Sequence, residues 1–185
     1  MNKAVFLDRD GTIIEDVGYL SNPQQIEFIP QSIEAIKLLN EAGYKVIVVT
    51  NQAGVARGYF TEDMLQTIDK TLQKQILRKG AYVDRIYYCP HHADHGIYPY
   101  NRECDCRKPN PGMLKKAAKD FDIDLSQSFM IGDKASDIGA GQNAGTKTIL
   151  VLSGRGEVEQ ERMTGKETHI ARNLLEAVNW LLKAR

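Results

Sequence analysis

The sequence has no excess of charge of either sign and no long apolar run. Lysine plus arginine and aspartate plus glutamate each number 24, so the formal net charge is zero. Proteins that grip long nucleic acids usually carry a basic excess, and a membrane-spanning helix needs about 20 apolar residues. The apolar run at residues 4–7 is also too short for the core of a signal peptide. These absences predict a cytoplasmic protein that binds neither nucleic acid nor membrane.

The chain also lacks internal repeats, low-complexity tracts and long linkers. With 185 residues, 42% hydrophobic and 26% charged, it has the composition of a globular protein with a full-sized core. We expect residues 1–185 to form one domain, and nothing in the sequence requires more than a monomer.

Apolar runs alternate along the chain with segments of helical periodicity. Strands are expected over residues 4–7, 44–50, 83–88, 128–131 and 148–152, and helices over residues 32–42, 61–80, 111–121 and 136–144 and from Asn173 onward. This alternation predicts an α/β fold with a Rossmann-like parallel sheet covered by helices on both faces. Ligand sites in such folds lie beyond the carboxyl ends of the strands, where Asp8, Thr50 and Asp133 are expected.

The segment Asp8-Arg9-Asp10-Gly11-Thr12 directly follows the first strand. An exposed carboxylate has a pKa near 4, so Asp8 is expected to be ionised and able to act as a nucleophile. Asp10 can then serve as a general acid and afterwards as a general base, and Gly11 permits a tight turn. A turn with two solvated acids would give the same pattern.

A substrate phosphate and a nucleophilic carboxylate are both negative and repel each other, so a site for such a substrate needs a cation. Mg²⁺ prefers oxygen ligands and commonly binds through one or two carboxylates plus phosphate. Asp8 and Asp133 can supply those carboxylates. Lys108 and the hydroxyl of Thr50 can hold the remaining phosphoryl oxygens.

The three cysteines fall in one short stretch, which favours metal binding over disulfides. Cys89 and His91, followed by Cys104 and Cys106, make a closed set of four Zn²⁺ ligands with no open position for chemistry. A structural zinc-binding loop over residues 89–106 would hold the residues that follow it. The alternative is three free thiols and a surface histidine.

Four motifs together resemble the haloacid dehalogenase-like (HAD) hydrolase superfamily. They are Phe6-Leu7-Asp8-Arg9-Asp10-Gly11-Thr12, then Val48-Val49-Thr50-Asn51, then Arg107-Lys108-Pro109, and finally Ile131-Gly132-Asp133-Lys134-Ala135-Ser136-Asp137. They occur in the order of the family and span most of the chain.

The resemblance implies a role for each residue of the acidic centre. Asp8 is the nucleophile that forms an aspartyl-phosphate, and Asp10 is the acid and base. Mg²⁺ is bound by Asp8, by the backbone carbonyl of Asp10 and by Asp133. Thr50 and Lys108 steady the phosphoryl group. Only 40 residues separate Asp10 from Thr50, which leaves no room for a large helical cap and predicts an essentially capless enzyme.

A zinc loop at this place resembles the loops of two branches of the superfamily, the D,D-heptose 1,7-bisphosphate phosphatases and the histidinol-phosphate phosphatases. The long insertion between His91 and Cys104 resembles the heptose branch. That resemblance implies removal of the 7-phosphate, which leaves heptose 1-phosphate for nucleotide-heptose synthesis toward lipopolysaccharide core or surface glycan. Histidinol phosphate is the alternative substrate, and a nucleic-acid 3′-phosphatase and a non-catalytic zinc-binding adaptor are weaker alternatives. The preferred sugar anomer stays open.

Further residues are candidates for binding the sugar phosphate substrate. Arg107 can hold the sugar or its second phosphate bidentately, unless it forms a surface salt bridge. By the same resemblance, Lys134 contacts phosphate or orients the acid. Asp137 either supports the magnesium site or is a favourable charge at a helix start. The other candidates belong to a loop after the first motif and to the segment after Thr50: Asp16, Val17, Gly18, Tyr19, Asn51, Gln52 and Ala53.

Overall fold

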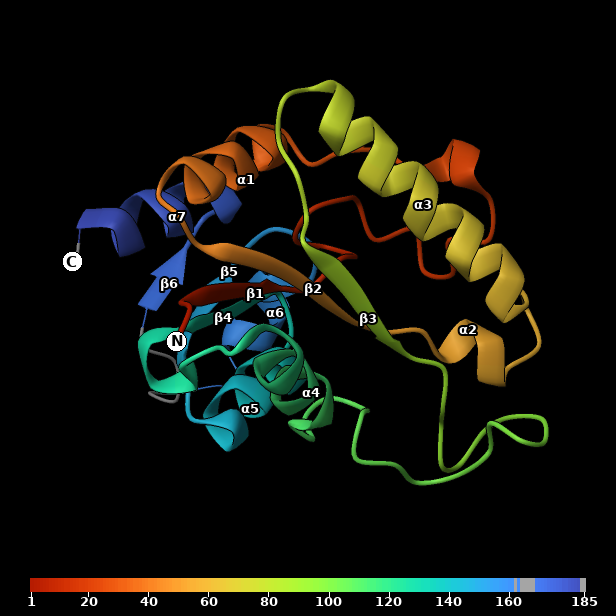
Figure 1. Cartoon of the computed structure of the whole chain (residues 1–185). Coiled ribbons are helices and arrows are strands. Elements are labelled where there is room, and N and C mark those ends of the chain that lie inside the picture. The colour runs from red at the N-terminus through yellow and green to blue at the C-terminus, as the bar shows by residue number, and fades with distance from the viewer. Residues whose placement is uncertain (162, 164–168, 184–185) are drawn as a thin grey trace.

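The computed structural model describes residues 1–161, 163 and 169–183. Within that part of the chain, six strands form one parallel sheet in the order β3-β2-β1-β4-β5-β6 (Figure 1). The strands are β1 (Ala4–Leu7), β2 (Lys45–Asn51), β3 (Arg85–Cys89), β4 (Phe129–Gly132), β5 (Lys147–Val151) and β6 (His169–Ala171). The helices are α1 (Ser32–Glu41), α2 (Ala53–Ala56), α3 (Glu62–Arg78), α4 (Gly112–Phe121), α5 (Ala135–Ala144), α6 (Gly156–Gln160) and α7 (Leu174–Lys183), with short 3-10 turns at Pro23–Gln25 and Leu125–Gln127.

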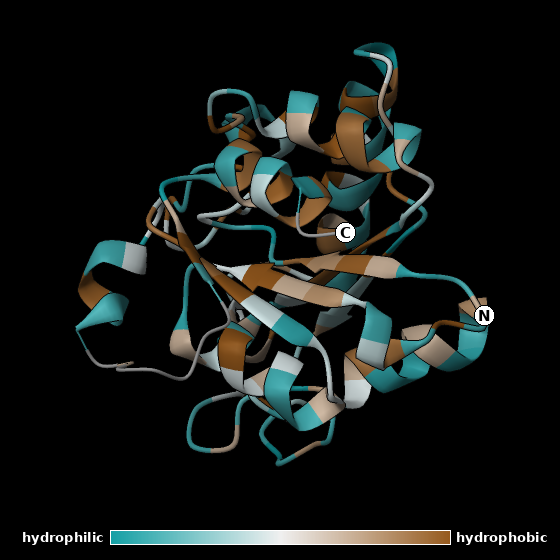
Figure 2. Ribbon diagram, turned by 90° about the vertical axis from the view of Figure 1, so that its left-hand side faces the viewer, coloured by the Kyte–Doolittle hydropathy of each residue, from teal (hydrophilic) through white to brown (hydrophobic). Residues whose placement is uncertain are grey.

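Helices cover both faces of the sheet, as the alternating pattern predicted. Helices α1, α3 and α7 lie on one face, and α4 and α5 lie on the other (Figure 1). In Figure 2, hydrophobic residues (brown) lie both on the strands and on the helices above and below them. A strand with covered faces cannot expose either side to water, which explains why β1 and β4 are buried at every position.

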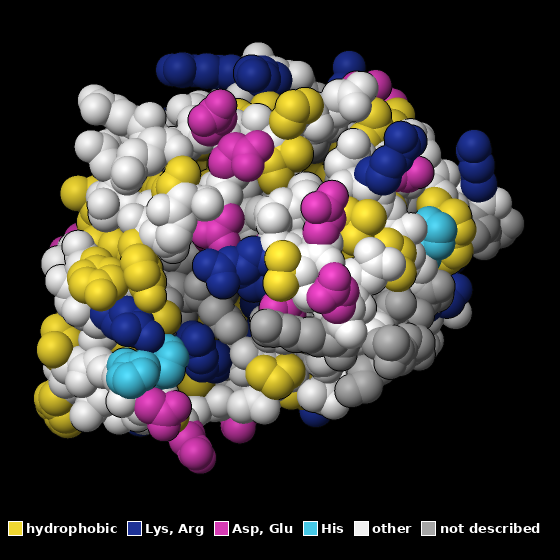
Figure 3. All heavy atoms as spheres, turned by 180° about the vertical axis from the view of Figure 1, so that it is seen from behind, with side chains coloured by type: hydrophobic (Ala, Val, Ile, Leu, Met, Phe, Trp, Pro, Cys, Tyr) yellow, Lys and Arg dark blue, Asp and Glu magenta, His cyan; other side chains and the backbone are white. Residues whose placement is uncertain are grey.

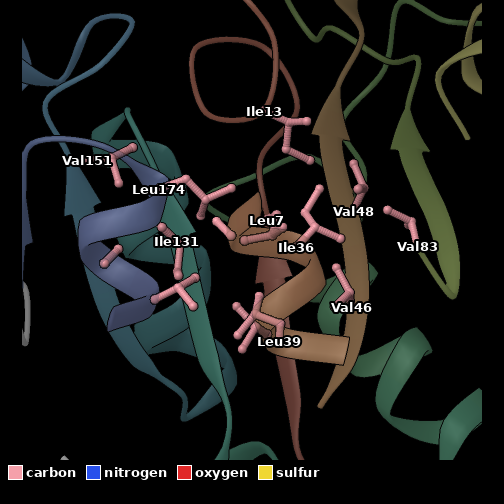
Figure 4. Packing of buried hydrophobic residues seen from close by; sticks show 14 of the residues in the cluster. Leu7, Ile13, Ile36, Leu39, Val46, Val48, Val83, Ile131, Val151 and Leu174 are labelled. Carbon is pink, nitrogen blue, oxygen red and sulfur yellow. The ribbon is translucent and has the colours of Figure 1, made fainter. Parts of the chain in front are cut away.

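The larger part of the core lies between the sheet and α1, α3 and α7. Figure 4 shows Ile36 and Leu39 of α1 packed toward Leu7 of β1 and Val48 of β2. The opposite face is filled mainly from α4, α5 and the alternate positions of the same strands. Burial on both faces holds the strands rigidly, and this fixes the residues that follow their carboxyl ends.

The predicted helix starts are confirmed where a side chain caps them. The hydroxyl of Thr61 accepts a hydrogen bond from the Met64 backbone N–H at 3.2 Å, and Asn173 Oδ1 accepts one from the Glu176 N–H at 3.0 Å. Such caps satisfy backbone donors that lack a partner within the helix.

Element boundaries differ from the predictions by one or two residues at most ends. The strand expected from residue 83 begins at Arg85, because the Asp84 carboxylate accepts the Val46 N–H at 2.8 Å and takes the place of a ladder partner. Three elements were not predicted: α2, α6 and β6. His169 is half-buried in β6, and its ring stacks on Trp180 with centroids 4.2 Å apart.

No helix in the described part of the chain is both long and apolar enough to cross a lipid bilayer.

Candidate active site

The predicted site residues converge at the carboxyl edge of the sheet. Asp8 follows β1, Thr50 lies near the end of β2, and Asp133 follows β4. Lys108 reaches the same place from the segment before α4, and its Nζ lies 2.8 Å from Asp8 Oδ1. Because β1 lies between β2 and β4 in the sheet, the nucleophile candidate stands at the centre of this group.

Asp8 is buried, with only 4% of its surface exposed, so the expectation of an exposed carboxylate is wrong. Lys108 Nζ lies beside its Oδ1, and Lys134 Nζ lies 3.9 Å from its Oδ2. Burial raises the pKa of Asp8, but the two lysine charges outweigh this effect and hold the pKa below its ordinary value. The carboxylate is therefore ionised for a different reason from the one expected.

Lys108 is held by contacts on both its side chain and its backbone. Besides Asp8, its Nζ lies 2.6 Å from Asp137 Oδ1 and donates to the Val49 carbonyl at 2.8 Å. Burial alone would lower the pKa of Lys108, but Asp137 and Asp8 raise it, so the amine keeps its charge. Asn51 contacts the Lys108 backbone in both directions, donating to its carbonyl and accepting from its N–H at 3.0 Å each. Asn51 thus orients Lys108.

Asp133 is fully buried, and only one of its two carboxylate oxygens accepts a hydrogen bond in the described part of the chain. Its Oδ2 accepts the backbone N–H of Arg155 at 2.9 Å, whereas its Oδ1 has no hydrogen-bond partner among the described residues. Burial and the nearby Asp8 carboxylate raise the pKa of Asp133 to about 8. Oxygens of Asp8, Asp133 and Asp137 lie within 4.8 Å of one another. Lys134 Nζ lies 3.7 Å from Asp133 Oδ1, beyond hydrogen-bond distance, and a buried carboxylate oxygen that accepts no hydrogen bond suits a divalent cation.

Asp137 lies at the start of α5 and contacts Lys108, and its support of a magnesium site stays a prediction. One oxygen contacts Lys108, and the other accepts the Lys134 backbone N–H at 3.0 Å at the start of α5. Gly11 is required at its position for two reasons. Its φ is +87°, and a Cβ there would lie 2.2 Å from Asp133 Oδ2.

Asp10 is held by the side chains of Gln52 and Arg9. Gln52 Nε2 donates to Asp10 Oδ2 at 2.9 Å and to Thr50 Oγ1 at 2.8 Å. The Arg9 guanidinium donates to both Asp10 oxygens, at 3.1 and 3.2 Å, and to Asp69 of α3 at 3.0 Å. Sequence reasoning missed Arg9 and Asp69. The available signal was an acid on the apolar stripe of a helix, because a buried acid requires a partner.

A cleft of about 320 Å³ opens above these residues. Among the predicted substrate residues, its lining includes Asp10, Asp16, Gly18, Tyr19, Asn51, Gln52, Ala53, Arg107 and Lys134. Val17 is outside that lining and is 48% exposed. Lys134 Nζ lies 3.2 Å from Asp16 Oδ2 and 3.5 Å from the Asp10 carbonyl. Arg155 also lines the cleft and was not predicted; its position after the fifth strand could have indicated it.

Aromatic and basic side chains lie beside Tyr19, which lines the cleft. The rings of Tyr19 and Tyr59 meet edge to face at 4.7 Å, and the Arg57 guanidinium lies 6.0 Å from the Tyr19 ring. The His92 and His95 rings are 5.1 Å apart. In Figure 3, histidine side chains lie beside basic and hydrophobic ones on one face of the molecule.

The four predicted zinc ligands gather in one cluster at the base of the loop between β3 and α4. Their ligand atoms all lie within 4.8 Å of one another. Cys106 Sγ lies 3.2 Å from Cys89 Sγ, 3.3 Å from Cys104 Sγ and 3.5 Å from His91 Nδ1. These separations suit a tetrahedral ion with ligand bonds of about 2.0–2.3 Å. Arg107 Nη1 donates to the His91 carbonyl at 3.0 Å, so the cluster is coupled directly to the cleft.

The chain belongs to the haloacid dehalogenase-like hydrolase family. The model of that family matches residues 5–108, and a second model described as HAD-hydrolase-like matches residues 105–177. The parallel sheet, the acidic centre and the motif order agree with that membership.

Relatives within the family are heptose bisphosphate phosphatases. The chain is 48% identical to D-glycero-beta-D-manno-heptose-1,7-bisphosphate 7-phosphatase of Pasteurella multocida, over 84% of each sequence. It is 40% identical to the corresponding alpha enzyme of Burkholderia mallei, over 97% of this chain and 94% of the relative. The crystal structure of D,D-heptose 1,7-bisphosphate phosphatase from B. bronchiseptica, complexed with magnesium and phosphate, superposes with a TM-score of 0.89 at 32% identity and covers 99% of both chains.

Proposed function

We propose that this chain removes the 7-phosphate of D,D-heptose 1,7-bisphosphate, with Asp8 as the nucleophile. The observation that carries the proposal is an ionised, buried Asp8 between two lysines, in a small hollow of about 40 Å³ that shares Lys134 with the cleft. The chain is also similar to heptose bisphosphate phosphatases. The product, heptose 1-phosphate, would serve nucleotide-heptose synthesis. Action in the cytoplasm and a monomeric state are further predictions.

In the first step, an oxygen of Asp8 attacks phosphorus and the bond from phosphorus to the sugar oxygen breaks. Asp10 gives its proton to the departing oxygen, a form of catalysis worth ~10²–10⁴-fold. Lys108 and Lys134 balance the negative charge that gathers at the phosphoryl group. Thr50 Oγ1 accepts from Gln52, which leaves its own proton for a phosphoryl oxygen.

In the second step, the aspartyl-phosphate on Asp8 is hydrolysed. Asp10, now ionised, takes a proton from water, and the water oxygen forms a bond to phosphorus. The bond between phosphorus and Asp8 breaks, inorganic phosphate leaves and both carboxyl groups return to their starting states.

Magnesium would be held by Asp8, by the backbone carbonyl of Asp10 and by Asp133, whose Oδ1 accepts no hydrogen bond from any described residue, an observation that fits the ion. When bound, Mg²⁺ screens the negative charge shared by carboxylate and phosphate. Zinc would be held by Cys89, His91, Cys104 and Cys106. A closed set of four ligands gives a structural site, and it would fix Arg107 through the His91 carbonyl.

We assign recognition of the rest of the sugar to the walls of the cleft. Arg107 is suited to the second phosphate because its guanidinium forms bidentate contacts with phosphate oxygens. A second hollow of about 610 Å³ borders the zinc loop and shares Arg107 with the cleft, which gives a bulky substrate room beyond the reacting phosphate. Asp16 and Tyr19 would contact the substrate from the opposite side.

Phosphate release from both heptose bisphosphate anomers and from histidinol phosphate tests the proposal. With Mg²⁺, the wild type is expected to hydrolyse heptose bisphosphate, and Asp8→Asn is expected to release no phosphate while it retains its fold. Asp84→Asn is a matched control, because it removes an ion pair with Lys45 at 2.8 Å that lies outside the cleft. Fast turnover of histidinol phosphate alone would refute the sugar assignment, and an active Asp8→Asn would refute the nucleophile.

A further inference from the structure

Arg9 is a cation buried at the base of the cleft, with a side chain only 1% exposed. A buried guanidinium is costly unless opposite charges and hydrogen bonds surround it. Arg9 has two such partners. Its Nε and Nη2 donate to the two oxygens of Asp10, and its Nη1 donates to Asp69 Oδ1.

Asp69 is fixed independently of the acidic centre. It lies on α3, a helix of 17 residues whose Leu65, Ile68 and Leu72 are completely buried. The Asp69 side chain is 10% exposed and borders a groove between α3 and β3, and it is not part of the cleft lining. The helix therefore anchors Arg9 from the side opposite to the substrate.

We infer that Arg9 and Asp69 are positioning residues for Asp10. Asp69 fixes the guanidinium, and the guanidinium fixes the plane of the Asp10 carboxylate through two parallel hydrogen bonds. Gln52 holds the same carboxylate from the side of Thr50. The inference rests on the proposed function, in which Asp10 gives a proton to the departing oxygen.

Asp10 acts as an acid in the first step and as a base in the second, and only the first step depends on the leaving group. A sugar alkoxide is a poor leaving group and depends on the proton from Asp10, whereas p-nitrophenolate departs without it. The second step follows departure of the leaving group, so it affects kcat and does not enter kcat/KM. A displaced Asp10 should therefore lower kcat/KM for a sugar phosphate and leave kcat/KM for p-nitrophenyl phosphate almost intact. A general loss of folding would lower both rates equally.

The test compares kcat/KM for heptose bisphosphate and for p-nitrophenyl phosphate in wild type, Asp69→Ala and Asp69→Asn. Asp69→Ala should lower kcat/KM for the sugar phosphate ~10–100-fold and change kcat/KM for the aryl phosphate by less than about threefold. Asp69→Asn keeps an oxygen acceptor for Arg9 and should show a smaller loss with the same selectivity. KM should stay unchanged, because Asp69 does not line the cleft.

Asp84→Asn is the control, because it removes an acid from the ion pair with Lys45 outside the cleft. Its kcat/KM for both substrates should match wild type. Equal losses on the two substrates in both Asp69 variants would overturn the inference, as would unchanged rates. If the wild type hydrolyses histidinol phosphate and not heptose bisphosphate, the proposed substrate fails. The same comparison is then made with histidinol phosphate, which is also an alkyl phosphate.

Discussion

Replacing Gly11 with alanine tests how closely the acidic centre is packed. A Cβ at this position would lie 2.2 Å from Asp133 Oδ2, and contacts below 3.0 Å are essentially never tolerated, so the carboxylate must move by 0.8 Å or more. Asp133 has little space to move, because it is fully buried and bonded to the Arg155 backbone. The substitution also places a Cβ at φ +87°, which costs roughly 1–2 kcal/mol.

We expect Gly11→Ala to lose activity far beyond its loss of stability. A misplacement of about 1 Å in catalytic geometry can cost ~10²-fold in rate, so kcat/KM should fall by about that factor. If Asp133 binds magnesium, the Mg²⁺ concentration that gives half-maximal activity should rise as well. Phosphate release measured across an Mg²⁺ titration, together with thermal unfolding, gives both quantities.

Gly145→Ala is the matched control for this experiment. Gly145 also has φ +87°, but nothing lies within 4 Å of the position that a Cβ would take. It should lose the same roughly 1–2 kcal/mol of stability and keep its activity. If Gly11→Ala retained the kcat/KM of Gly145→Ala, the steric reasoning about Asp133 would be refuted.

Three further predictions follow from the two clusters and the cleft. Cys104→Ser should lose the one zinc ion that metal analysis is expected to find, and its kcat/KM should fall. His95→Asn, in the same loop, should keep the zinc ion and the wild-type kcat/KM. An active zinc-free protein would contradict the structural site. The pKa of Asp133, raised to about 8, means that the metal-free folded state holds a proton that the unfolded state releases near pH 4. The proton on folded Asp133 therefore adds to the free energy of unfolding below about pH 4, and this stabilisation is lost as pH rises toward 8. The thermal midpoint of the metal-free protein should fall over that range more steeply than that of Asp133→Asn, and equal slopes would refute the assignment. Arg107→Lys should raise KM for heptose bisphosphate about tenfold and hardly affect p-nitrophenyl phosphate, because only the former has a second phosphate to hold; parallel changes for both would argue against that role.

Local patterns in the sequence were enough for most of the fold. Val46-Ile47-Val48-Val49 forms a strand because its side chains avoid water on both faces, and Thr61 starts a helix because its hydroxyl caps a free N–H. The missed elements are short. Three residues in β6 and four in α2 give no periodicity that distinguishes them from a loop.

The meeting of Asp8, Thr50 and Asp133 was also predictable, because the carboxyl ends of parallel strands share one edge of a sheet. The cluster of Cys89, His91, Cys104 and Cys106 could be predicted from ligand chemistry and spacing alone. Such features depend on the order of residues along one chain segment or on a general rule of sheet topology.

Tertiary structure alone decided the electrostatics of the site. Arg9 and Asp69 are 60 residues apart, and their contact depends on how α3 is rotated against the sheet. The burial of Asp8, and the lack of a hydrogen bond to Asp133 Oδ1 within the described residues, depend on which side chains and backbone groups close around them. Sequence specified which charges are present, whereas packing determined their solvent exposure and their partners, because both are properties of the surrounding atoms.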